Sequence, residues 1–226
     1  MSRSGDWALE LQQEQDSLRD FDYEYEQYEA EMQWLAENPF EEIYTAFGGR
    51  LRQLQSVLDA DVTIFTNTVI FKMVYVHAVT LFEAMVGDVV KASVLTRPTF
   101  KGRLTSRIDE LNKGRKYSLK EIFSHKDGAD GIVMEILSTL TFHNAETAKR
   151  TVEIICDGVV NTKNFKAMRD VVESRHDFAH RNGKTVGDEF RGIDRAIVLD
   201  ALGVIERFAN DIYECISDAA KRDTFL

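Results

Sequence analysis

One stretch of the chain is long, apolar and free of turn signals, and it restricts the fold more than any other feature. Residues 61–95 read DVTIFTNTVIFKMVYVHAVTLFEAMVGDVVKASVL. Its β-branched residues favour strands, but strands in globular proteins rarely exceed about ten residues. Because nothing punctuates the run before Arg97-Pro98, we expect one long buried helix that ends there.

The rest of the chain also favours helices. Only two prolines occur in 226 residues, and prolines usually punctuate strands, turns and loops. The 44% of hydrophobic residues is enough for one good core or two small ones. We therefore expect an all-α protein. Its further helices are predicted at residues 6–37, 40–58, 130–142, 144–156, 162–182 and 191–221, with loops and short helices at 99–129.

Particular residues are expected to mark helix ends. Gly48-Gly49 is expected to interrupt the helix at 40–58, and Asn144 is expected to cap the N-terminus of the helix that follows it. Gly158 suits a left-handed C-terminal cap. Asn182-Gly183 supplies the stop for the helix at 162–182.

The acidic residues are concentrated at the N-terminal end. Residues 1–42 hold 13 acidic residues against Arg3 and Arg19, a net charge of −11, whereas residues 43–226 hold 25 acidic and 26 basic residues, a net charge of +1. We therefore expect an acidic helical arm at 1–42 and a helical domain at 43–226. The arm either packs on the body or a partner, or covers a nucleic-acid site, because it would repel a polyanion.

We expect a cytoplasmic protein that does not associate with a membrane. The N-terminal residues lack the apolar core of a signal peptide, and no apolar run approaches the roughly 20 residues that span a bilayer. Cys156 and Cys215 lie in apolar helical patterns, which fits buried free thiols in a reducing compartment. Neither cysteine has a further ligand at zinc spacing.

A basic segment and an absent motif bear on nucleotide and nucleic-acid binding. Residues 101–116, KGRLTSRIDELNKGRK, carry six basic residues, which form either a solvated loop or a phosphate-binding rim. No Gly-rich phosphate loop follows a strand, so a Rossmann or P-loop enzyme is not expected.

The segment that carries the chemistry is MRDVVESRHDFAHRNGKTVGD, residues 168–188. At about 100° per residue, Arg175 falls in the middle of an apolar helix face, and His176 and His180 flank that face. A guanidinium there must reach an acid, a cleft or a partner subunit, because burying a lone charge is costly. The predicted face consists of Met168, Val171, Val172, Phe178 and Ala179.

Arg175 and His180 suit the cleavage of RNA without a metal ion. Histidine takes or gives a proton near neutral pH, and arginine forks onto the oxygens of a phosphate. On one ideal helix the two side chains point about 140° apart. A second subunit, or a bend near the helix end, would bring them to one phosphate.

The same residues resemble a known family. Residues 175–180, Arg-His-Asp-Phe-Ala-His, resemble the Arg-x4-6-His motif of HEPN domains, and the following Arg-Asn-Gly at 181–183 is similar to the RiboL-PSP-type branch. More loosely, Leu81-Phe82-Glu83-Ala84 is similar to an acid-bearing helix near the start of many such domains. The resemblance covers about residues 60–220 and leaves out the acidic arm.

The resemblance implies a HEPN-like helical bundle with the acidic N-terminal helix as an addition. It implies a homodimer whose motif helices face each other across a cleft, acting as a metal-independent endoribonuclease without a cofactor. Active members are often toxins or effectors of antiviral defence, so an antitoxin or a defence-complex partner is a further expectation. The alternative is an inactive HEPN module that binds RNA or a nucleotide, or acts as a scaffold in a defence complex.

The resemblance also implies roles for individual residues. Arg175 would bind the scissile phosphate, and His180 would be the general base or acid. His176 would orient the substrate. The remaining implied residues are Asn182 and Lys184 as substrate contacts, and Glu83 and Asp177 as supporting side chains.

Each of these residues also has a structural interpretation. His180 suits a helix C-terminal cap, His176 a surface position, and Arg175 an ion pair with Glu83. The other three histidines have no convergent partners in the sequence and are expected to be structural: His77, His125 and His143. Acidic pairs such as Asp109-Glu110 are expected to be solvated rather than to bind metal.

Overall fold

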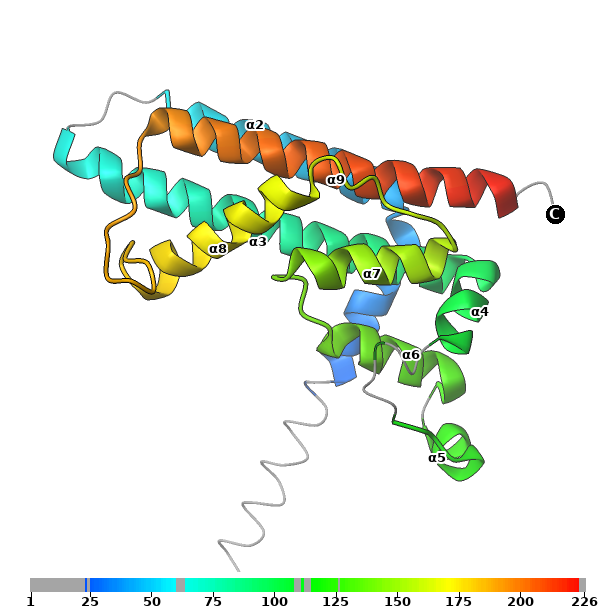
Figure 1. Cartoon of the computed structure of the whole chain (residues 1–226). Helices are drawn as coiled ribbons and strands as arrows, with labels where there is room; N and C mark the ends of the chain where they lie inside the picture. Colours follow the sequence, from blue (N-terminus) through cyan, green and yellow to red (C-terminus); the bar gives the residue numbers. More distant parts are fainter. Residues whose placement is uncertain are drawn as a thin grey trace, which may run out of the picture. The chain divides into compact units, whose positions relative to one another are not determined.

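The structure is a computed structural model, and it describes residues 23, 25–59, 64–107, 111, 115–125 and 127–223. Throughout these residues the regular secondary structure is α-helical, which confirms the all-α class (Figure 1). A single antiparallel bridge, Lys184–Phe190, is the sole β-type pairing among them. Most of the predicted first helix, residues 6–22, lies outside the described residues, while residues 25–37 are helical.

The chain divides into two units between Asn38 and Pro39. The sequence-based expectation places the boundary after Glu42, and in the structure residues 40–42 form the first turn of α2 (Phe40–Val57). Pro39 has φ −63° and ψ 156°, an extended conformation that starts the new helix. The second unit contains the predicted motif.

Helix α3 (Ile64–Thr96) is the centre of the second unit and confirms the prediction of one long helix. It packs against six other helices, and Figure 1 shows α2 and α9 running alongside it. Phe82 of α3 and Phe208 of α9 are fully buried, with ring centroids 5.8 Å apart. Burying such a side chain contributes about 1.5–3 kcal/mol. The remaining helices are α4 (Pro98–Ser106), α5 (Leu119–Ser124), α6 (Gly128–Thr139), α7 (Ala145–Cys156), α8 (Phe165–His180) and α9 (Arg195–Asp223).

The apolar character of α3 also meets the length and composition of a membrane span, over Thr68–Thr96. This corrects the expectation that no apolar run is long enough. About 39% of the most apolar window is buried inside the chain, and Lys72, Glu83 and Asp88 interrupt the surface of the helix. A core helix of a soluble protein meets the same criterion, and α3 occupies the core here.

Two of the predicted helix boundaries are wrong. Helix α2 continues through Gly48-Gly49, because Phe47 and Leu51 are buried on either side of the glycines and offset a cost of about 1 kcal/mol per glycine. At the end of α7 the left-handed residue is Asp157, with φ 45°, rather than Gly158. Gly158 instead donates its N–H to the Glu153 carbonyl at 3.3 Å.

Other predicted ends are confirmed. The Asn144 side chain accepts the N–H of Glu146 at 2.9 Å and caps α7. After α8, Asn182 and Gly183 have φ 53° and 89°, and the Gly183 N–H donates to the Asp177 carbonyl at 2.8 Å. The left-handed pair therefore ends the motif helix as a C-terminal cap.

Two cations of the basic segment after α3 form structural ion pairs. Lys101 lies 2.7 Å from Asp130, and Arg103 lies 2.7 Å from Asp223. These two cations are therefore not available for a phosphate-binding rim. Cys156 is buried and Cys215 is half-buried, and both are free thiols, as expected. A hydrogen bond with Cys215 and burial raise the pKa of the Cys156 thiol.

Candidate functional site

Helix α8 is held on the core through Tyr75 of α3. The Tyr75 hydroxyl donates to the Val171 carbonyl at 3.2 Å, and its ring meets Phe178 edge-on with centroids 5.1 Å apart. Burial raises the pKa of Tyr75 to about 12, so the phenol keeps the proton that it donates. These contacts fix which face of α8 points to the core.

The buried face of α8 is rotated relative to the prediction. Ala179 is exposed and Val172 is half-buried, whereas the predicted polar residue Asp177 is buried. The face is therefore centred near Val171 and Phe178, and Arg175 lies at its edge, with 23% of its side chain exposed. An edge position gives the guanidinium access to both the core and the surface.

The Arg175 guanidinium was expected to reach an acid, a cleft or a partner subunit. In the structure it lies near an acid and lines a cleft. Its Nη2 lies 4.0 Å from Oε2 of Glu83 on α3. Arg175 Nε and Glu83 Oε1 are buried without a hydrogen-bond partner among the described residues. The pairing is therefore loose, and the guanidinium retains capacity for another anion.

The cleft is a pocket of about 300 Å³ along one side of α8. Two arginines and two histidines line it together with two carboxylates and two valines. Because both arginines stay charged at any physiological pH, the pocket suits an oxyanion such as a phosphate. Its lining residues are His143, Val172, Glu173, Arg175, His176, Asp177, Arg181 and Val186.

His180 lies outside the lining of this pocket. It is exposed at the last residue of α8, and its ring centroid lies 4.9 Å from that of His176. The single chain therefore brings Arg175 and His176 into one pocket but leaves His180 beside it. This agrees with the angle of about 140° that an ideal helix puts between Arg175 and His180.

Asp177 is a structural anchor at the base of the site. Its side chain is only 5% exposed, and it accepts a hydrogen bond of 2.6 Å from Nε of Arg191. Nη1 of Arg181 lies 3.7 Å from its other oxygen. The carboxylate thereby fastens the loop after α8 to the helix and offsets part of the positive charge of Arg181.

Asn182 and Lys184 are engaged in the loop after α8 and do not line the pocket. The Asn182 carbonyl accepts a hydrogen bond from Nζ of Lys72 at 3.0 Å. Nζ of Lys184 lies 2.6 Å from Asp188 and 5.3 Å from the centre of the Phe190 ring. Both residues therefore shape the loop in the single chain.

Sequence reasoning missed His143 and Arg181 as pocket residues. His143 was expected to be structural, but it precedes α7 in a loop that lies against α8. Only the packing of α7 on α8 brings it there, so spacing along the chain carries no signal for it. Arg181 directly follows the motif, and its position next to His180 was a usable signal. His125, by contrast, lies 3.5 Å from Glu135 and away from the pocket.

The part of the chain that the structure describes contains no group of three or more His, Cys, Asp or Glu side chains that could hold a metal ion. Asp109-Glu110 lies outside the described residues.

The chain was also compared with known proteins. No family model, no curated protein and no solved structure matches it.

Proposed function

We propose that this protein is a metal-independent endoribonuclease of HEPN type, with Arg175 and His180 as its catalytic residues. The reaction forms a bond between the 2′-oxygen and phosphorus and breaks the bond to the 5′-oxygen. An imidazole takes the proton from the 2′-hydroxyl, and a proton is delivered to the leaving 5′-oxygen. The products are a 2′,3′-cyclic phosphate and a 5′-hydroxyl end.

The observation that carries the proposal is the incompletely paired Arg175 at the edge of the pocket along α8. Its guanidinium shares the pocket with Arg181 and His176. Its one acidic neighbour in the described residues, Glu83, lies at the 4.0 Å limit of an ion pair. A phosphate would supply the acceptors that Arg175 lacks, and the negative charge that grows on the phosphorane would strengthen these contacts.

The position of His180 favours a composite site in a homodimer. In a single chain His180 lies beside the pocket, next to His176. The side chains of Val69 and Met73 on α3 are 56% and 65% exposed. Between them in sequence, Lys72 contacts Asn182 at the end of α8. Exposed apolar side chains this close to the motif fit a surface that a second copy covers, so that His180 of one subunit serves Arg175 of the other.

A second candidate function is RNA or nucleotide binding without cleavage. The observation in its favour is that Arg175 and Arg181 line the pocket without His180. Two arginines are sufficient to bind a phosphate, whereas proton transfer requires a positioned imidazole. In this case the protein acts as a binding module or scaffold, for example in a defence complex.

The test uses a short synthetic RNA and a matched oligonucleotide with a 2′-deoxyribose at each position. Cleavage of the RNA only, with cyclic phosphate ends on the products, is the expected result. Cleavage of both oligonucleotides would contradict the proposed attack by the 2′-hydroxyl. Binding of both without any cleavage would support the second candidate.

A further inference from the structure

The two cysteines are far apart in the sequence but meet where α7 packs on α9. Cys156 is the last residue of α7, and Cys215 lies on α9. The thiol of Cys156 donates a hydrogen bond to the sulfur of Cys215. A Cβ added at Gly158 would lie 3.8 Å from Cβ of Cys156 and 3.7 Å from Sγ of Cys215. Two sulfurs that already touch need only a small movement to form a covalent bond.

Two arginines hold the end of α7 against α9. Nη2 of Arg222 on α9 donates to the Cys156 carbonyl at 3.0 Å. Nη1 of Arg103 donates to the Ile155 carbonyl at 3.4 Å, and the same guanidinium lies 2.7 Å from Asp223 on α9. The last carbonyls of a helix have no partner within the helix, so these arginines supply one. The backbone that carries Cys156 is therefore fixed next to the helix that carries Cys215.

The two thiols differ in exposure and in their readiness to lose a proton. Cys156 is fully buried, whereas Cys215 is half-buried. The hydrogen bond from Cys156 lowers the pKa of the Cys215 thiol, and Arg222 lowers it further, against burial and the carboxylates of Glu153 and Asp218. The same hydrogen bond and burial raise the pKa of the Cys156 thiol. Cys215 is therefore the thiol that meets an oxidant as a thiolate, and Cys156 is the partner that resolves the oxidised sulfur.

We propose that Cys156 and Cys215 form a reversible disulfide when the protein meets hydrogen peroxide. The Cys215 thiolate attacks one peroxide oxygen, so an S–O bond forms and the O–O bond breaks. The departing hydroxide takes up the proton that the Cys215 thiol released. The Cys156 sulfur then attacks the Cys215 sulfur, which forms the S–S bond and breaks the S–O bond, and the oxygen leaves as water with the proton of Cys156. Two electrons pass from the sulfurs to the peroxide, and a dithiol reductant reverses the modification.

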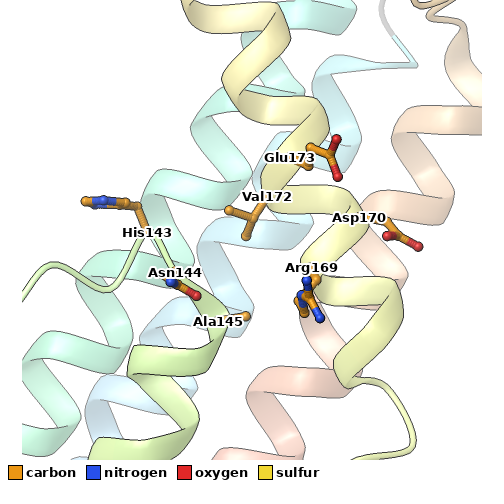
Figure 2. A pocket seen from close by; sticks show the side chains of 7 residues that line it. All are labelled: His143, Asn144, Ala145, Arg169, Asp170, Val172 and Glu173. Atoms are coloured by element: carbon orange, nitrogen blue, oxygen red, sulfur yellow. The ribbon is translucent and has the colours of Figure 1, made fainter. Parts of the chain in front are cut away.

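The disulfide fixes a helix that also forms one wall of the candidate site. Figure 2 shows Asn144 and Ala145 at the start of α7 and Val172 on α8, which line a depression between the two helices. His143, which precedes α7, lines both this depression and the pocket along α8. Cys156 lies at the other end of the same helix. The cross-link therefore ties this helix to α9, and it also restricts the unfolded chain, which stabilises the folded protein.

The test treats the full, reduced chain with hydrogen peroxide and follows its intact mass and its free thiols. We expect both thiols to disappear with the loss of two hydrogen atoms, about 2 Da. After tryptic digestion the peptides 151–163 and 208–221, which hold the two cysteines, should be cross-linked. The thermal unfolding midpoint should rise by roughly 5–10 °C. Dithiothreitol should restore both thiols and the original midpoint.

Two single variants separate the roles of the thiols. Cys156→Ala removes the resolving thiol, so Cys215 should gain oxygen instead of forming a bond within the chain. Cys215→Ala is the matched control, and its buried Cys156 should stay reduced under the same exposure. A wild type that keeps both thiols, that gains oxygen at Cys215 without a cross-link, or that forms disulfides only between chains would overturn the proposal. These results do not depend on whether the protein cleaves RNA.

Discussion

The guanidinium Nη2 of Arg175 on α8 lies 4.0 Å from the carboxylate Oε2 of Glu83 on α3, and each side chain also has a buried polar atom without a partner in the described residues. A close, fully hydrogen-bonded ion pair would neutralise the arginine and fix its role as structural. This looser pair holds the guanidinium at the pocket edge and leaves it able to bind a phosphate.

Replacement of Arg175 tests its role at the phosphate. Arg175→Ala should lower the rate of RNA cleavage by about 10²–10³-fold, the usual loss when one group that stabilises an oxyanion is removed. Arg175→Lys keeps the charge but loses the planar fork, so an intermediate rate is expected. Arg207→Ala, an exposed arginine on α9 outside the pocket, is the matched control. Equal rates for wild type and Arg175→Ala in a gel-based cleavage assay would refute the role.

Glu83 is a positioning residue in this account. Glu83→Gln keeps the shape of the side chain but removes the charge that faces Arg175, so we expect kcat to fall about tenfold with KM changed much less. Glu206→Gln on the exposed side of α9 should leave both constants unchanged. If Glu83 acted only in stability, the variant would lower the unfolding midpoint and leave kcat of the folded protein intact.

Asp177 should contribute to stability through Arg191. Asp177→Asn removes a buried carboxylate that accepts a hydrogen bond of 2.6 Å, which should cost about 2 kcal/mol in the free energy of unfolding. Urea denaturation should show a lower midpoint with an unchanged slope. Asp188→Asn breaks an exposed ion pair with Lys184 and should cost less than about 1 kcal/mol. Equal losses in the two variants would contradict the anchoring role of Asp177.

The raised pKa of Tyr75 predicts a pH dependence of stability. Burial raises this pKa from 10.0 to about 12, so between these values the unfolded chain loses the phenol proton before the folded protein does. The folded state then binds more protons, and the contribution of Tyr75 to stability falls as the pH rises from 10 to 12. At pH 8, Tyr75→Phe should be about 1 kcal/mol less stable because it loses the hydrogen bond to Val171. The difference should vanish between pH 10 and 11 and reverse toward pH 12, because a shift of about two pKa units outweighs one hydrogen bond. Parallel stability curves would contradict this prediction.

Features encoded by neighbouring residues were predictable from the sequence. Pro98 and the Asn182-Gly183 pair mark helix ends, and Asn144 caps α7, because their backbone preferences act over one turn. The apolar stretch is too long for a single strand, so it predicted the helix α3 despite its β-branched residues.

Features set by tertiary packing were not predictable. Helix α2 passes through Gly48-Gly49 because its neighbours are buried. The rotation of α8 depends on how Tyr75 and Phe178 meet. His143 reaches the pocket only through the packing of α7 on α8. None of these contacts leaves a periodic signal in the sequence.

The most direct test of the central claim is the incubation of wild type and His180→Ala with total RNA in the presence of EDTA. We expect the wild type to cut RNA in EDTA, and His180→Ala to lose this activity while its circular dichroism spectrum stays helical. Loss of the wild-type activity in EDTA would contradict a reaction carried by one arginine and one imidazole without a metal ion.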